Sequence, residues 1–387
     1  MIKREAERFV RALARGFPIV AVTGPRQSGK TTLVKAVFPK KKYITLEDPD
    51  EYEFANSDPR RFLERFPDGA ILDEIQRCQQ LFSYLQSLVD ADGRCGLFIL
   101  TGSQQFGLLA KISQSLAGRV GLLQLLPFSL KELETGKKLI NDLDRAILKG
   151  FYPPVHVRKI SPANWYSSYM MTYIERDVRQ VLQVRELGSF QKFVRLCASR
   201  TGQILNLSAL GAECGITHNT AKAWISVLEA SYILVLLHSF HRNFGKRLVK
   251  APKLYFLDPG FAAWLIGLKD SEHLCIHSHR GALFETLVVS ELIKTRWNYG
   301  LSHNLFYWRD HIGNEVDLIF EDGESVVPIE IKSGKTILDE AFRGLRHFRK
   351  ISDEKSGAAF LIYGGEEEYH REEFTLLPWQ KSRKSIS

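Results

Sequence analysis

The stretch Gly24-Pro-Arg-Gln-Ser-Gly-Lys-Thr31 decides the fold of the amino-terminal third of the chain. It matches the pattern G-x-x-x-x-G-K-[ST] in the required context, because the β-branched run Phe17–Thr23 precedes it and residues 31–38 follow with helical spacing. Helical stretches, notably 80–89, alternate with further strand-like runs at 43–46, 70–72, 97–100 and 120–126. This alternation predicts an α/β domain with an open parallel sheet over residues 1–135.

The residue types of the loop suit a phosphate chain. Glycines let successive backbone N–H groups turn inward around a β-phosphate, and the amino terminus of the next helix adds its positive dipole end. Lys30 supplies a point charge to the β- and γ-phosphates, and the Thr31 hydroxyl is a ligand for Mg²⁺. The alternative, a glycine turn without function, requires the constrained positions to coincide by chance. We therefore expect ATP and Mg²⁺ to bind here, through Gly24, Pro25, Arg26, Gln27, Ser28, Gly29, Lys30, Thr31 and Thr32.

Two adjacent acids end another predicted strand, Gly69-Ala-Ile-Leu-Asp73-Glu74. In P-loop ATPases the first acid of such a pair holds Mg²⁺ and the next one polarises the attacking water. Side chains at the end of a strand point to opposite faces, so the two carboxylates can divide these roles. We therefore predict that Asp73 holds the metal and that Glu74 is catalytic, with Lys30 as the catalytic cation.

Two more polar groups are candidates for the same site. The run 97–100 ends in Thr101-Gly-Ser103-Gln104, which fits a polar sensor near the γ-phosphate with Ser103 or Gln104 as the candidate. The alternative is an ordinary strand-end turn. Arg119 is placed like an arginine supplied to a phosphate in cis or by a neighbouring subunit, and the alternative is a structural ion pair. A homo-oligomer is compatible with the sequence, which does not fix the oligomeric state.

Composition and charge describe an ordinary soluble globular protein. The 387 residues are 44% hydrophobic and 25% charged, and at roughly 150 residues per domain they suffice for two to three domains. The formal net charge of +9 is compatible with a nucleic-acid partner without requiring one. The five cysteines never form a Cys-x-x-Cys pair, so a disulfide framework or a thiolate zinc site is not expected. The charged amino terminus, and apolar runs far shorter than the ~20 residues of a spanning helix, predict a cytoplasmic protein without membrane contact.

After the first domain, residues 1–135, the sequence divides into three further parts. Residues 136–200 read as a helical linker region with periodic apolar and aromatic residues. Residues 201–255 are predicted to form a winged helix-turn-helix. Residues 256–387 read as another α/β domain, with a helix at 282–297. Its predicted strands are 305–308, 316–320, 326–332 and 358–363.

The winged-helix prediction rests on the order helix, glycine turn, helix and strand, at 207–213, Gly215, 217–230 and 233–240. The segment His241–Lys253 that follows holds five cations and no acid, among them Arg242, Lys246 and Arg247. A wing with this charge suits a DNA backbone. The side chains placed to read base edges are Thr217, His218, Asn219, Thr220 and Lys222. The alternative is a protein–protein or interdomain module with a solvated charge run.

A nuclease-like pattern follows in Glu315-Val-Asp317 and Glu330-Ile-Lys332, on two predicted strands joined by the tight turn 321–324. Strand alternation puts Glu330 and Lys332 on one face. Asp317 and Glu330 can then clamp Mg²⁺ while Lys332 orients water or stabilises charge on a phosphate, and Glu285 on the preceding helix is the third carboxylate. This resembles the PD-(D/E)XK nuclease core, with valine where that pattern has proline. The alternative is a set of surface residues on a fold that has lost cleavage.

Nearly the whole chain resembles the AAA-like ATPases of bacteria and archaea that carry a nuclease-like carboxy-terminal domain of unknown function. The resemblance includes the phosphate loop, Leu-Asp-Glu-Ile-Gln, Leu-Thr-Gly-Ser, Leu-Ala-Gly-Arg with Leu-Pro-Phe-Ser, and the stretch Tyr173–Asp177. It implies an ATPase. We therefore predict that ATP hydrolysis is coupled to a DNA-directed carboxy-terminal module with a nuclease-like site. The alternative is a nucleotide-dependent switch whose carboxy-terminal domain is inactive and docks a protein partner.

Overall fold

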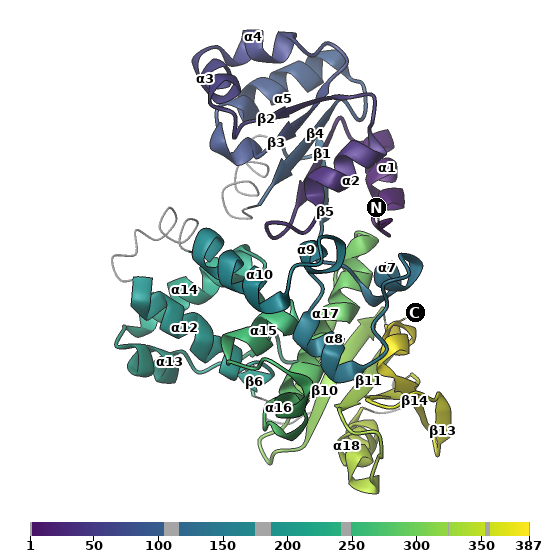
Figure 1. The fold of residues 1–387 in the computed structure, drawn as a ribbon. Coiled ribbons are helices and arrows are strands. Elements are labelled where there is room, and N and C mark those ends of the chain that lie inside the picture. Colours follow the sequence, from purple (N-terminus) through teal and green to yellow (C-terminus); the bar gives the residue numbers. More distant parts are fainter. Residues whose placement is uncertain are drawn as a thin grey trace. The chain divides into compact units, whose positions relative to one another are not determined.

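The computed structural model of the chain describes residues 2–103, 116–174, 187–240, 249–323, 325–352 and 357–386 (Figure 1). The chain divides into two compact units. The first unit comprises Met1–Lys137 with the short segments Ala230–Tyr232 and Arg296–Ser302, and the second unit comprises the remaining residues. Within the described ranges, no helix is both long enough and apolar enough to cross a membrane.

The first unit is built on a parallel five-stranded sheet in the order β2-β3-β4-β1-β5. The strands are β1 (Ile19–Thr23), β2 (Lys42–Thr45), β3 (Ala70–Asp73), β4 (Phe98–Gly102) and β5 (Val120–Gln124). Each lies where the sequence predicts a strand, so the predicted α/β fold class is confirmed. The order places β4 between the strand that leads into the phosphate loop and the strand that ends in the two acids.

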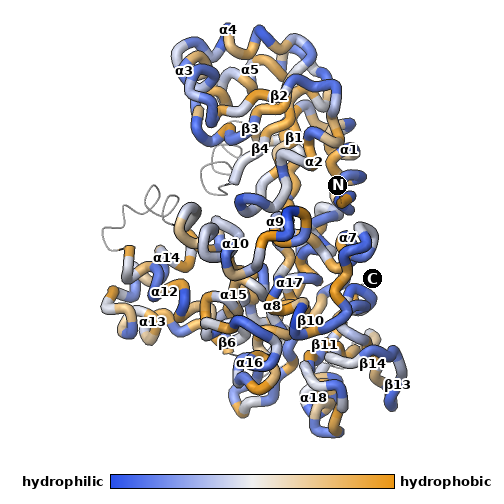
Figure 2. Tube along the Cα trace, viewed as in Figure 1, coloured by the Kyte–Doolittle hydropathy of each residue, from blue (hydrophilic) through white to orange (hydrophobic). Residues whose placement is uncertain are grey.

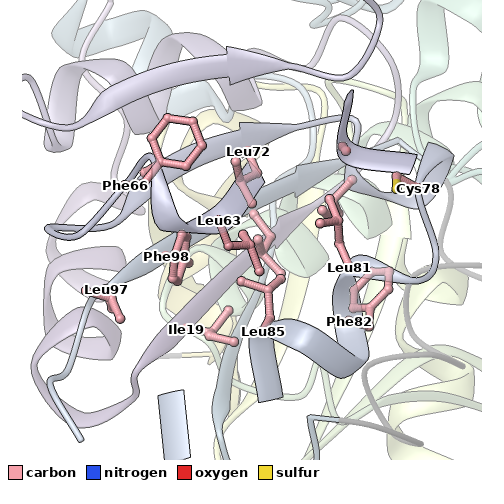
Figure 3. Close-up of a cluster of buried hydrophobic side chains, with 14 of the residues drawn as sticks. Ile19, Leu63, Phe66, Leu72, Cys78, Leu81, Phe82, Leu85, Leu97 and Phe98 are labelled. Carbon is pink, nitrogen blue, oxygen red and sulfur yellow. The ribbon is translucent and has the colours of Figure 1, made fainter. Parts of the chain in front are cut away.

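Helices cover both faces of this sheet (Figure 1). On one face α1 (Glu7–Gly16) and α2 (Lys30–Val37) pack against Val20 and Val22. On the other face α4 (Pro59–Glu64) and α5 (Leu81–Asp92) contribute to a second buried cluster around Ile19 and Ala21, and part of this cluster is drawn in Figure 3. The apolar strands are the orange segments inside the first unit in Figure 2. The remaining helices of this unit are α3 (Pro49–Ser57), α7 (Leu130–Thr135) and the 3₁₀ turn Ile75–Arg77.

The second unit begins with helices, as the sequence predicts for residues 136–200. They are α8 (Leu143–Lys149), α9 (Pro153–Val157), α10 (Pro162–Tyr169), a π-helical turn (Met170–Ile174) and α12 (Leu187–Ser199). Most of the Tyr173–Asp177 stretch lies outside the described residues.

The predicted helix-turn-helix elements are present in the second unit. They are α13 (Leu207–Cys214), a left-handed Gly215 with φ of 69°, and α14 (His218–Ala230). A small sheet follows in the order β6-β8-β7, formed by β6 (Gln203–Ile204), β7 (Leu234–Leu237) and β8 (Lys253–Phe256). Arg242, Lys246 and Arg247 of the predicted wing lie outside the described residues.

A six-stranded mixed sheet in the order β13-β14-β12-β11-β10-β9 forms the carboxy-terminal part of the second unit. Four of its strands were predicted, and β13 and β14 were not. β9, β10 and β11 pair antiparallel, whereas β11, β12 and β14 pair parallel. The strands are β9 (Leu305–Arg309), β10 (Glu315–Asp322), β11 (Ser325–Lys332), β12 (Ala359–Tyr363), β13 (Tyr369–Arg371) and β14 (Phe374–Pro378). The helices of this region are α15 (Pro259–Leu265), α16 (Ser271–Ile276), α17 (Arg280–Asn298), α18 (Arg343–Ile351) and the 3₁₀ segments Asp339–Phe342 and Trp379–Ile386.

Candidate functional site

The phosphate-binding pattern lies between the carboxyl end of β1 and the start of α2, where open α/β sheets bind ligands. Gly24 has φ of 146° and Gly29 has φ of 96°, conformations that favour glycine. A Cβ atom at Gly24 would also clash with the carbonyl oxygen of Leu125. The ammonium of Lys30 is buried and donates to the carbonyl oxygens of Gly24 at 3.0 Å and Pro25 at 2.8 Å. The loop is therefore wrapped around the one lysine that the sequence assigns to the phosphates.

Asp73, at the end of β3, accepts hydrogen bonds from three hydroxyl groups. Thr31 donates to Oδ2 at 2.9 Å and Tyr43 donates to the same oxygen at 2.7 Å. Thr101, at the end of β4, donates to Oδ1. Burial and the bond to Asp73 raise the pKa of Tyr43, so this hydroxyl keeps its proton. The contact with Thr31 joins the phosphate loop to the predicted metal-binding acid, and hydroxyl and carboxylate oxygens are ligands that Mg²⁺ prefers.

The second acid, Glu74, has partners of its own. Its Oε2 atom accepts from the Ser103 hydroxyl at 3.2 Å and from the side-chain amide of Gln76. Glu74 adopts φ of 56°, a left-handed conformation that is uncommon for a residue with a side chain. Asp73 and Glu74 are thus held by different donors, Thr101 for the first and Ser103 for the second. Gln104, the other predicted sensor, lies outside the described residues.

Arg119 lies away from the loop. It directly precedes β5, whose first residue, Val120, pairs with Ile19 at the start of β1, whereas the loop follows the end of β1. Strands of this length separate their two ends by roughly 13 Å. The Arg119 guanidinium instead forms an ion pair with Asp90 of α5, with one N–O distance of 2.8 Å. Arg119 thus forms a structural ion pair, which is the alternative that the sequence left open, and it does not reach the phosphate loop of its own chain.

The second candidate site lies on β10 and β11 of the carboxy-terminal sheet. The ammonium of Lys332 lies 2.5 Å from Glu330 Oε1 and 3.6 Å from Asp317 Oδ2. Asp317 also accepts from the backbone N–H of Ile331 at 2.9 Å. The other oxygen of Glu330, Oε2, is buried and finds no hydrogen-bond partner among the described residues. Burial, and then the nearby charge of Asp317, raise the pKa of Glu330.

Lys253 contacts two further acids of this region, Glu285 and Glu315. The sequence did not predict this buried ammonium group for the site. It lies 3.4 Å from Glu285 Oε1 on α17 and forms a shorter ion pair with Glu315. Tyr255, also on β8, donates to Glu285. Burial lowers the pKa of Lys253, but Glu285, Tyr255, Asp317 and Glu315 together raise it well above its usual value. Because Lys253 is only 3% exposed, its assignment to a DNA-binding wing was wrong.

The three predicted metal ligands lie in one region, and each of them contacts a lysine: Glu285 contacts Lys253, and Asp317 and Glu330 contact Lys332. Among the described residues no three histidine, cysteine or acidic side chains form a group that could hold a metal ion. A cavity of about 550 Å³ borders this region and is lined by Glu315, Glu330 and Lys332. A buried carboxylate oxygen that has no partner among the described residues fits a ligand for a cation, but Glu285 would first have to exchange Lys253 for that cation.

The residues predicted to read DNA bases lie at the start of α14. Thr217, His218, Asn219 and Lys222 are exposed, and the Thr217 hydroxyl accepts from the backbone N–H of Thr220 at 3.1 Å. Thr217 therefore caps the helix, and the other side chains are accessible to a partner.

Three protein-family models match successive parts of the chain. Residues 16–134 match the AAA domain, residues 140–272 match a domain of unknown function (DUF8612), and residues 280–381 match another (DUF4143). Uncharacterized proteins of Mycobacterium tuberculosis and Mycobacterium bovis are each 29% identical over 368 residues, which cover 94% of this chain and 80% of theirs. The predicted AAA-like domain with a carboxy-terminal domain of unknown function is thus confirmed.

Two solved structures of P-loop proteins are similar to parts of the chain. A Walker-type ATPase of Pyrococcus abyssi has 16% identity and a TM-score of 0.46, covering 68% of this chain and 96% of that chain. The RuvB Holliday junction branch migration motor of Thermotoga maritima has 18% identity and a TM-score of 0.30, covering 60% and 89%.

Proposed function

We propose that this AAA-like protein binds ATP with Mg²⁺ on residues 24–32 and hydrolyses it. The observation that carries the proposal is the 2.9 Å hydrogen bond between the Thr31 hydroxyl and Asp73. It joins the first helix after the loop to the end of the acid-bearing strand, which is the arrangement that a metal bridging the phosphates and the protein requires. Mg²⁺ bound there would neutralise charge on the β- and γ-phosphates.

The residues of the site divide the work in this proposal. Lys30 exchanges its two carbonyl partners for phosphate oxygens, and the N–H groups of the loop hold the β-phosphate. Glu74 accepts a proton from the attacking water, and Ser103, which donates to Glu74 at 3.2 Å, orients that carboxylate. Arg119 acts only if a neighbouring subunit brings it to this site, which makes a homo-oligomer part of the proposal.

The test compares Lys30→Ala and Glu74→Gln with the unchanged protein. Calorimetry should detect ATP binding to the unchanged protein and to Glu74→Gln, but not to Lys30→Ala. Phosphate release should be lost in both variants. Unchanged protein that is folded and binds neither ATP nor GTP would overturn the proposal.

The second part of the proposal is a DNA-directed, metal-dependent nuclease site on β10 and β11. It is supported by Lys332, which lies against Glu330 and Asp317, by the Glu330 oxygen that has no partner among the described residues, and by the cavity that Glu330 and Lys332 line. Asp317 and Glu330 would hold the metal, with Glu285 as the third ligand, and Lys332 would stabilise charge on the phosphate.

A cleavage assay with Mg²⁺ or Mn²⁺ separates this function from its alternative. DNA cleavage that Lys332→Ala abolishes, while ATP binding is kept, supports the nuclease site. ATP turnover without cleavage of any DNA or RNA form favours the alternative, a nucleotide-dependent switch that docks a protein partner. Cleavage that persists in Lys332→Ala contradicts the assignment of the site.

A further inference from the structure

Arg4 is a buried arginine that contacts the phosphate loop through the carbonyl oxygen of Ser28. It precedes α1 and is only 6% exposed. Its guanidinium donates to the carbonyl oxygen of Ser28 at 2.7 Å, in the middle of the loop, and to that of Leu126 at 2.7 Å. It also donates to Glu132 at 2.9 Å and stacks over the ring of Phe128, 5.1 Å from its centroid. The arginine therefore ties the loop to the segment that follows β5.

The partner acid, Glu132, is fixed by bonds of its own. One carboxylate oxygen accepts from the backbone N–H of Glu5 as well as from Arg4. The other accepts from the backbone N–H of Ser129, whose hydroxyl in turn accepts from the N–H of Glu132. This reciprocal capping box starts α7. The segment 126–132 thus places an acid, an aromatic ring and a carbonyl oxygen around a single guanidinium.

The bond to Ser28 determines the direction of the next amide. In a trans peptide the C=O and N–H groups point in opposite directions, and the described backbone has no cis peptide. When the Ser28 carbonyl is held by Arg4, the N–H of Gly29 must face away from the guanidinium. In this pattern the amides of the loop meet the β-phosphate.

We infer that Arg4 is a positioning residue for nucleotide binding: it holds the Ser28–Gly29 peptide so that the Gly29 N–H faces a phosphate. This rests on the proposed ATP binding. Arg4 orients the peptide rather than attracting the phosphate by its charge, because the buried Glu132 neutralises the guanidinium, with 2.9 Å between Arg4 Nε and Glu132 Oε1. Lysine would keep the charge but would lack the planar fork that reaches Glu132 and two carbonyl oxygens at once.

The experiment measures affinity for ADP and ATP by calorimetry and turnover at saturating ATP. Arg4→Ala and Arg4→Lys should each weaken both affinities about tenfold, the effect of one well-placed hydrogen bond to a charged group, while turnover falls much less. Glu132→Gln turns one of the two accepting oxygens into an NH2 group that faces another N–H donor, so it loosens the hold on Arg4 and should weaken both affinities in the same direction as Arg4→Lys. Arg11→Ala is the matched control, because Arg11 donates to the carbonyl of Val37 at the far end of α2.

An NMR measurement distinguishes a changed direction of the Gly29 N–H group from a general loss of folding in the Arg4 variants. In glycine-labelled protein the Gly29 amide resonance should move downfield on ADP addition, and this movement should be reduced in Arg4→Lys even if Arg4→Ala folds poorly. Unchanged affinity and an unchanged Gly29 shift in Arg4→Lys would overturn the inference while leaving ATP binding in place. Absence of nucleotide binding by the unchanged protein would overturn the proposed function and this inference together.

Discussion

The buried acids of the two candidate sites have different kinds of hydrogen-bond partner. In the first unit Asp73 accepts from the hydroxyls of Thr31, Tyr43 and Thr101. In the second unit Glu330 meets the ammonium of Lys332, and Glu285 meets that of Lys253. Neutral hydroxyls leave the charge of Asp73 uncompensated, so a divalent cation gains the full attraction of the carboxylate. Ammonium groups already supply that attraction, so a cation in the second unit must compete with them.

This difference separates the two sites by their dependence on metal. The first site fits a cation that arrives with the nucleotide and joins donors already in place. The second site is stable as a set of ion pairs, and its use as a metal centre requires Lys253 or Lys332 to move. This difference between the two sites can be tested by substitutions that each remove one lysine ammonium from the second site or one hydroxyl donor from the first site.

The largest effect is expected from Lys253→Met in the second unit. Methionine keeps the apolar stem but leaves Glu285 and Glu315 without their buried counter-ion, which should lower the free energy of unfolding by about 3 kcal/mol. Lys332→Met is the matched variant: the Lys332 side chain is 39% exposed, and Glu330, whose pKa burial already raises, can take up a proton when its counter-ion is gone, so we expect a smaller loss of about 1 kcal/mol. Urea denaturation measures both.

The double variant Lys253→Met with Glu285→Gln should recover part of this loss, because one uncompensated carboxylate is removed. Equal losses in the two single lysine variants would contradict the view that Lys253 is the main charge of the buried cluster.

A smaller, pH-dependent effect is expected at His156 of α9, which also lies in the second unit. Burial lowers the pKa of His156 to about 4, although its bond to the Gly150 carbonyl opposes this, and Lys149, Lys294 and Lys138 lower it further. The unfolded chain binds a proton near pH 6.5 and the folded chain does not, so stability is lost as pH falls from about 6.5 towards 4.

At pH 5 this loss should reach about 2 kcal/mol relative to pH 7.5. His156→Gln should remove that difference, and thermal unfolding of both proteins at the two pH values measures it. The same pH dependence in His156→Gln would assign the loss to other groups of the unit.

The loop and its first acid could be predicted because both are local patterns. The spacing of Gly24, Gly29 and Lys30 specifies a turn into a helix, and Asp73 directly follows an apolar run. Thr101 and Tyr43 could not be assigned to Asp73, because their contacts depend on the strand order β2-β3-β4-β1-β5. Only pairing between distant segments determines that order.

Only the local part of the second site could be predicted from the sequence. Glu330 and Lys332 share a face through strand alternation, which is visible in the sequence. Lys253 stands at the end of a run of cations, where charge pattern favours a solvated wing. Its burial depends on the pairing of β8 with β7 and on the acids of α17 and β10. β13 was missed because it has only three residues, with acidic residues on both sides. The length of β14 does not explain why it was missed, since β9 and β12 also have five residues.

The smallest effect, and the sharpest test of the hydroxyl arrangement, is expected from Thr101→Val in the first unit. Valine keeps the shape of threonine but leaves Asp73 Oδ1 without a side-chain donor among the described residues, whereas Oδ2 keeps Thr31 and Tyr43. Loss of this donor to a buried oxygen should lower ATP turnover about tenfold. Tyr43→Phe is the matched control, because Thr31 still donates to Oδ2 and turnover should fall only two- to threefold, about the cost of a shared bond. Phosphate release at saturating ATP measures both, and an equal loss in the two variants would show that the distribution of donors over the two Asp73 oxygens does not govern the site.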